Sequence, residues 1–115
     1  MHTLGKKVVI ITGAGSGFGR SLALEMADRK AIPIIVDINA EGLAETAKLL
    51  EGKAARYGKH ALDICSRAAW DEVAAKVEKE FGGIDSLINN AGVMSRAESF
   101  LELAEDHCRF IFEVN

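Results

Sequence analysis

Short apolar runs alternate with amphipathic stretches along most of this chain. Residues 8–11 are four β-branched apolar residues in a row, which predicts a strand buried on both faces, and residues 32–37 predict another. A more polar strand near residues 56–64 is expected at an exposed edge, and a short strand begins at residue 84. Apolar residues recur at helical spacing over residues 17–29, 40–51, 67–81 and from 100 to the end.

This alternation predicts an α/β fold built on a parallel sheet, with right-handed crossovers that place helices on both faces. The 115 residues suffice for a single domain. Phe18, Leu22 and Met26 repeat at intervals of four residues, which predicts one apolar face for the first helix. Met26 is expected in the core, and Phe18, which lies within the glycine-rich turn, could serve both the core and a site at the turn.

A glycine-rich turn, Thr12-Gly-Ala-Gly-Ser-Gly-Phe-Gly19, joins the first strand to the first helix. The missing Cβ atoms let the backbone turn sharply and let a bulky ligand approach it. The following helix directs its free N–H groups and positive dipole end at the turn, which suits a pyrophosphate. A tight turn that binds nothing is the alternative, but the strand–turn–helix setting favours a dinucleotide site.

The glycine spacing is T-G-x-x-x-G-x-G, and it resembles the opening of the short-chain dehydrogenase/reductase family. A second stretch, Asn89-Asn-Ala-Gly92, is similar to another signature of that family. The resemblance extends from Val8 to Asn115. It implies a Rossmann-like, doubly wound parallel sheet with strand order 3-2-1-4.

An acidic residue, Asp37, ends the second strand, 18 residues beyond Gly19. Asp is common as a cap before a helix, but a carboxylate at this distance from the turn accepts hydrogen bonds from an adenosine ribose. It would also repel a 2′-phosphate, so NAD is favoured over NADP as the cofactor. The resemblance adds an adenine contact for Asp63 and a cofactor border at Asn90, whereas Asn89 is expected to be structural. The cofactor-binding residues predicted are Gly13, Ser16, Gly17, Phe18, Gly19, Asp37, Ile38, Asp63, Ile64, Asn90, Ala91 and Gly92.

Catalysis in the resembled family uses an Asn, a Ser and a Tyr-x-x-x-Lys pair, in which the Tyr moves the substrate proton while hydride moves at the nicotinamide. Asn115 is the member of this set that the chain contains. The sole tyrosine, Tyr57, has Ala61 rather than Lys four residues later. Residues 1–115 are therefore expected to form a partial, NAD-binding N-terminal portion, a fragment that is inactive alone. The parent enzyme would transfer hydride between NAD and a small alcohol or carbonyl substrate.

A different class of function is a non-catalytic nucleotide-binding or interaction module that uses the same turn and Asp37. The strand that begins at residue 84 would then offer an unpaired apolar edge through which the chain could self-associate.

Composition narrows the remaining classes. The net charge of −3 gives no basic surface for nucleic acid, and the basic residues are expected to be solvated helix faces. The two cysteines have no metal-site spacing, and free thiols fit a reducing, cytoplasmic compartment. No apolar run is long enough to predict a membrane helix.

Overall fold

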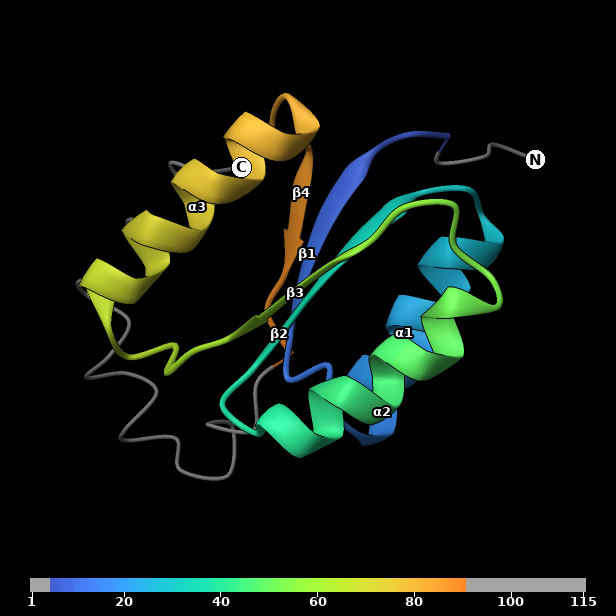
Figure 1. Cartoon of the computed structure of the whole chain (residues 1–115), viewed down its shortest axis with the longest axis horizontal. Coiled ribbons are helices and arrows are strands. Elements are labelled where there is room, and N and C mark those ends of the chain that lie inside the picture. Colours follow the sequence, from blue (N-terminus) through green and yellow to red (C-terminus); the bar gives the residue numbers. More distant parts are fainter. Residues whose placement is uncertain (1–4, 91–115) are drawn as a thin grey trace.

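A four-stranded parallel sheet forms the centre of the computed structural model, which describes residues 5–90 (Figure 1). The strands lie in the order β3-β2-β1-β4, which confirms the predicted Rossmann-like topology. Their bounds are β1 (Val8–Thr12), β2 (Ile32–Asp37), β3 (Gly58–Ala61) and β4 (Ser86–Ile88). The crossovers carry α1 (Gly17–Asp28), α2 (Ala40–Glu51) and α3 (Arg67–Phe81). The helix expected from residue 100 lies outside the described residues.

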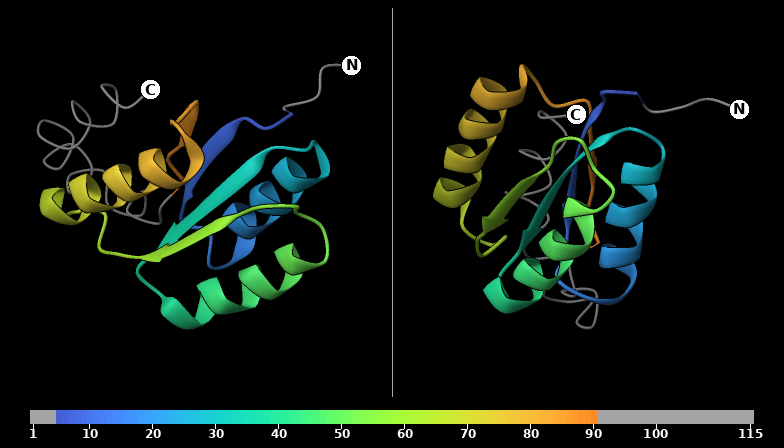
Figure 2. Two further views of the ribbon diagram at one scale, coloured as in Figure 1. Left: turned by 45° about the horizontal axis from the view of Figure 1, so that its top comes forward. Right: turned by 45° about the vertical axis from the view of Figure 1, so that its right-hand side comes forward.

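The sheet is covered on both faces, with α1 and α2 on one side and α3 on the other (Figure 2). Because successive strand side chains point to opposite faces, β1 contributes to two separate cores. Val9 and Ile11 join the cluster beneath α1 and α2, whereas Val8 and Ile10 join the cluster beneath α3. The unbroken apolar run of β1 is thereby buried completely.

The apolar face predicted for α1 is confirmed in part. Its buried residues are Gly19, Ala23 and Ala27, whereas Phe18 is 69% exposed. A Cβ placed on Gly19 would lie 2.1 Å from the carbonyl oxygen of Gly13, so the helix packs against the turn more closely than a large side chain allows. Leu22 and Met26 are partly buried and pack against the core, as predicted for Met26, whereas Phe18 lines the pocket at the glycine turn and does not join the core.

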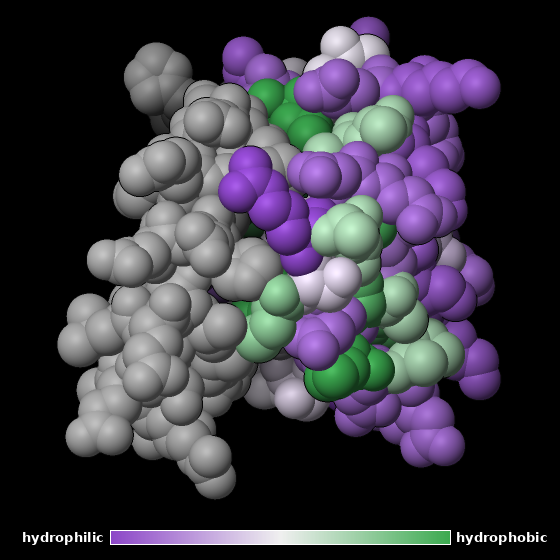
Figure 3. Space-filling view, turned by 90° about the vertical axis from the view of Figure 1, so that its left-hand side faces the viewer, coloured by the Kyte–Doolittle hydropathy of each residue, from purple (hydrophilic) through white to green (hydrophobic). Residues whose placement is uncertain are grey.

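The opposite face is packed with large side chains. Trp70, Val73 and Val77 of α3 are buried against the sheet. On the side of the molecule shown in Figure 3, most of the described surface is hydrophilic and apolar residues form small patches. The helices have 12, 12 and 15 residues, and within residues 5–90 none is long and apolar enough to cross a membrane.

The edge position of β3 is confirmed, since its residues alternate between half-buried and exposed and it pairs only with β2 among the described strands. The strand is shorter than the range of residues 56–64 predicted from the sequence. Asp63 lies two residues beyond it, in the loop that leads to α3.

Candidate functional site

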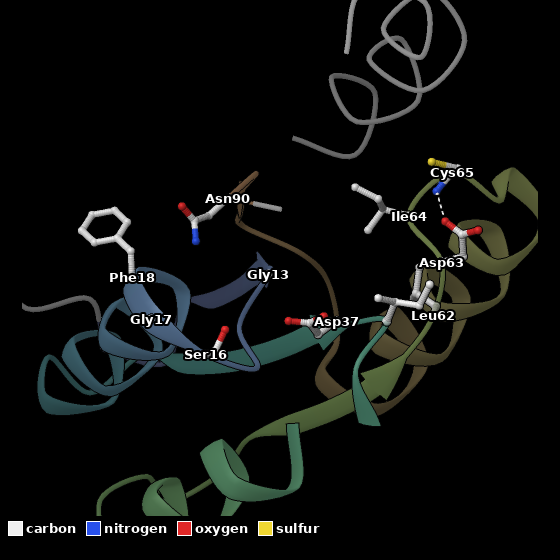
Figure 4. Close-up of a pocket in the computed structure, with 11 residues that line it drawn as sticks. Gly13, Ser16, Gly17, Phe18, Asp37, Leu62, Asp63, Ile64, Cys65 and Asn90 are labelled. Atoms are coloured by element: carbon white, nitrogen blue, oxygen red, sulfur yellow. Dashed lines mark hydrogen bonds between the residues drawn. The ribbon is translucent and has the colours of Figure 1, made fainter. Parts of the chain in front are cut away.

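A pocket of about 570 Å³ lies at the C-terminal ends of the strands (Figure 4). Nine of the ten described residues that the sequence predicted for a cofactor site line it. They are Gly13, Ser16, Gly17, Phe18, Asp37, Ile38, Asp63, Ile64 and Asn90. The predicted Ala91, Gly92 and Asn115 lie outside the described residues. Carboxyl ends of parallel strands at a topological switch point are where open α/β sheets bind ligands.

The glycine turn gives this pocket an anion-binding wall. Gly13 and Gly17 have φ angles of 65° and 53°, which are left-handed conformations that glycine adopts without strain. Ser16 is the N-cap of α1, yet its side chain makes no capping hydrogen bond, and the first turn contains no acidic residue. The first N–H groups of α1 have no acceptor within the helix. This wall therefore offers backbone donors and a positive dipole end to a phosphate.

Gly19, the tenth predicted residue, does not line the pocket but lies buried directly beneath it. A Cβ there would meet the Gly13 carbonyl and would also lie 2.9 Å from Nδ2 of Asn90. The role of this glycine is therefore close packing of α1 beneath the turn.

The carboxylate of Asp37 connects β2 to the turn. Its Oδ2 accepts a hydrogen bond from the Gly15 N–H at 2.9 Å, and its Oδ1 accepts one from the Asn39 N–H at 3.0 Å. An ionised carboxylate has about four acceptor positions, so both oxygens retain capacity for a ligand hydroxyl. Asp37 thus positions the turn and presents a negative charge to the pocket at the same time.

Helix α2 braces the turn from behind, a feature that the sequence analysis missed. The Thr46 hydroxyl is fully buried and donates to the Ala14 carbonyl at 2.8 Å. The Arg20 guanidinium donates to the Gly15 carbonyl, and to Thr46 Oγ1 at 2.9 Å. A Cβ on Gly42 would lie 2.5 Å from the Gly15 carbonyl oxygen. A threonine and a glycine on the buried side of the second helix were the signal for this contact.

A hydrogen-bonded link joins β1 to the Asn-Asn stretch after β4. The buried Thr12 hydroxyl donates to Oδ1 of Asn89 at 3.0 Å and accepts from the Asn90 N–H at 2.8 Å. Asn89 therefore has the structural contact expected of it, and Asn90 is held at the pocket wall.

The far wall of the pocket is the loop after β3. Asp63 is exposed, and its Oδ1 accepts from the Cys65 N–H at 2.9 Å. Leu62 and Cys65 also line the pocket and were not predicted. The Cys65 thiol is exposed, and its pKa is raised by partial desolvation and by the adjacent Asp63 carboxylate, which disfavours a nucleophilic thiolate.

Comparison with known proteins identifies the family to which the chain belongs. The family model described as short chain dehydrogenase matches residues 7–115. The chain belongs to the short-chain dehydrogenase/reductase family. Its described strands and helices are those of the N-terminal portion of that family's fold.

Curated relatives of this chain are oxidoreductases by name. The chain is 41% identical to mouse epidermal retinol dehydrogenase 2 over 110 residues. The aligned residues make up 95% of this chain and 35% of that protein. The chain thus spans about a third of the length of the curated relatives it matches.

Solved structures give the same result. Carveol dehydrogenase from Mycobacterium avium in complex with NAD has a TM-score of 0.75 and 30% identity, over 81% of this chain and 38% of that one. L-sorbose reductase from Gluconobacter frateurii, complexed with NADPH and L-sorbose, has a TM-score of 0.77 and 29% identity, over 95% of this chain and 47% of that one. Both nicotinamide dinucleotides therefore occur among family members with this architecture.

Tyr57, the sole tyrosine of the chain, lies in an environment that does not suit a catalytic acid or base. This tyrosine directly precedes β3, at the end of the strand away from the pocket. Its hydroxyl donates to Oε1 of Glu51 at 3.2 Å. Desolvation and the Glu51 carboxylate raise the pKa of Tyr57, whereas a catalytic acid or base needs a pKa near the working pH. Tyr57 is unsuited to the role by position and by charge environment.

Proposed function

We propose that this chain is the NAD-binding portion of an oxidoreductase that transfers hydride between NAD and a small alcohol or carbonyl compound. NAD supplies the hydride chemistry, and the described residues supply binding and orientation. The first turn of α1 would hold the pyrophosphate, Asp37 the adenosine ribose, and the loop at Asp63 and Ile64 the adenine. Asn90, with Ala91 and Gly92 beyond the described residues, would border the cofactor, and Asn115, also beyond them, is the catalytic candidate.

The observation that carries this proposal is the position of Asp37. It lies between the glycine turn and the pocket, and hydrogen bonds to Gly15 and Asn39 fix its orientation. A fixed carboxylate can accept from ribose hydroxyls and repels a 2′-phosphate at the same place. We therefore propose that the site prefers NAD to NADP.

Calorimetric titration of the purified chain with NAD and with NADP tests this preference. Asp37→Asn keeps an oxygen that can accept from Gly15 but removes the charge. Since a hydrogen bond to a charged group contributes about 1.5 to 3 kcal/mol, we expect the substitution to weaken NAD binding about tenfold or more and to narrow the difference from NADP. Asp71→Asn is the matched control, because Asp71 is an exposed acid on α3, away from the pocket. Equal affinity of the unsubstituted chain for NAD and NADP would refute the preference.

We further propose that the chain alone does not catalyse the reaction, because its sequence lacks the Tyr-x-x-x-Lys pair of the family. The purified chain mixed with NAD and a panel of alcohols should give no NADH absorbance. Turnover by the pure chain would contradict this.

A nucleotide-binding module that acts through association with another chain is the second candidate. The observation in its favour is that β4 has one strand neighbour, β1, among the described strands. Such a module would bind NAD and form dimers as its concentration rises, which analytical ultracentrifugation with and without NAD would measure. A monomer at all concentrations would exclude self-association through β4.

A further inference from the structure

A second pocket, of about 600 Å³, lies at the N-terminal ends of the strands, away from the cofactor pocket. It is formed by the segment before β1, the turn between α1 and β2, the loop between α2 and β3, and the end of α3. Figure 1 shows these segments together at the upper part of the view, at the other end of β1 from the glycine turn. The two pockets share no lining residue among those described.

Four cations surround this second pocket, which we call the basic pocket, and no acidic residue is among its described lining. The cations are Lys6, Lys30, Lys53 and Arg56. In residues 5–90, the ammonium groups of Lys6 and Lys30 have no ion-pair partner. These two lysines are therefore available to an external anion.

The other two cations are held in place by the protein. Lys53 Nζ lies 3.0 Å from Oδ1 of Asp28. The Arg56 guanidinium stacks 4.5 Å above the centroid of the Phe81 ring and donates to a backbone carbonyl at 3.0 Å. Arg56 and Phe81 thus form a fixed side wall for the basic pocket.

The floor of the basic pocket is apolar. Ala27, Ala31 and Ile32 line it and are at most 8% exposed. The lysines at the rim are exposed. A ligand that fits both parts carries its charge at the rim and an apolar body toward the floor.

Two of the rim lysines have a backbone conformation that favours glycine. The φ angles of Lys6 and Lys30 are 63° and 72°, and the Lys6 N–H donates to the Lys30 carbonyl at 2.9 Å. A lysine in the left-handed region is strained relative to glycine. The negative dipole end of α1, equivalent to about half a charge, accounts for a cation at Lys30. It does not account for Lys6. The C-terminal ends of α1, α2 and α3 together carry a negative charge that offsets less than half of the four positive charges around the pocket.

We propose that the basic pocket binds a small amphiphilic anion, one carboxylate or phosphate group on a short apolar chain. The anionic group lies between Lys6 and Lys30, and the apolar chain covers Ala31 and Ile32. The volume lies within the range of about 300 to 1,000 Å³ usual for small-molecule sites. Because the floor is recessed below the lysines, a free anion reaches it and a headgroup held in a flat bilayer does not.

Titration of the isotope-labelled full chain with monomeric decanoate, followed by NMR, tests the proposal. We expect saturable shifts of the Ala31 and Ile32 amides and no response of these amides to decanol. Lys30→Gly should weaken decanoate binding about three- to fivefold, the size of one exposed ion pair. The same substitution should raise the Tm, because glycine relieves the strain at this φ angle. Lys48→Gln, an exposed lysine on α2 outside the pocket, is the control and should bind decanoate unchanged.

Three results would overturn the proposal. They are equal responses to decanol and decanoate, unchanged decanoate affinity in Lys30→Gly, and shifts confined to the glycine turn. A fourth is cosedimentation of the chain with phosphatidylserine vesicles without decanoate binding, which would assign the lysines to a lipid surface. None of these results depends on NAD binding, so this test and that of the cofactor site can fail separately.

Discussion

The two faces of the sheet are packed in different ways. On the α1 and α2 face, Leu43 and Leu50 pack against aliphatic strand residues, but next to the glycine turn the backbones approach so closely that a Cβ on Gly19 or Gly42 would meet a carbonyl oxygen. On the other face, α3 packs Trp70, Val73 and Val77 against aliphatic strand residues. Both faces remove apolar surface from water, and the close backbone contacts of the first face also position the glycine turn.

This difference distinguishes contacts that position the glycine turn from contacts that contribute mainly to the free energy of unfolding. A close backbone contact tolerates no added atom, since interiors are packed to near-crystalline density. A large apolar core loses stability in proportion to the atoms removed, but the rest of the fold persists. Substitutions at the close backbone contacts of α1 and α2 should therefore act on the cofactor pocket, whereas those of buried α3 side chains should act on the free energy of unfolding.

The largest effect is expected from Gly19→Ala. One added methyl group meets the Gly13 carbonyl carbon at 2.7 Å and the carbonyl oxygen closer still, so the turn must shift. We expect a loss of about 3 kcal/mol in the free energy of unfolding and loss of NAD binding in the fraction that stays folded. Urea unfolding and NAD titration measure the two effects.

Gly52→Ala is the matched control for that substitution. Gly52 is the C-cap that follows α2, its φ angle is −86°, and the nearest atom to an added Cβ is 3.8 Å away. Alanine there should change the free energy of unfolding by less than about 0.5 kcal/mol. A Gly19→Ala protein that binds NAD as well as Gly52→Ala would break the proposed division between the faces.

A smaller effect, of a different kind, is expected from Val77→Ala on the α3 face. Val77 is fully buried, and removal of two carbon atoms should lower the free energy of unfolding by about 2 kcal/mol. Its side chain does not line the cofactor pocket, so NAD affinity, corrected for the folded fraction, should not change. Ala75→Gly, at an exposed position of the same helix, controls for helix propensity. A drop in corrected NAD affinity in Val77→Ala would mean that the two faces are coupled.

The same division explains what could be predicted from the sequence. The strand order follows from the regular alternation and the family signatures, and the pocket wall at Gly13, Gly17 and Asp37 depends on residues at short, fixed spacings. The brace of Arg20 and Thr46 joins positions 26 residues apart and requires knowledge of how α1 and α2 pack. Phe18 was expected to serve both the core and the glycine turn, and it does not join the core, because periodicity reports which residues are apolar and not how near two backbones come. The basic pocket gathers residues from four separate segments, and no local pattern indicates it.

The smallest effect concerns a histidine on the α3 side of β3. Burial lowers the pKa of His60 from its ordinary 6.5, the Lys76 ammonium lowers it further, and Glu80 opposes the shift. The unfolded chain therefore binds the proton more readily, so the free energy of unfolding is highest above pH 6.5 and falls as the pH drops below that value.

Because His60 is only half-buried, we expect that fall to be about 0.5 kcal/mol or less. Urea unfolding at about pH 7.5 and about pH 5.5 measures it. His60→Gln removes the titration, so the variant should lose less stability than the unsubstituted chain over this interval. Equal losses in the two proteins would mean that His60 titrates alike in the folded and unfolded chain, and that the α3 face contributes to stability through apolar packing and not through this charge.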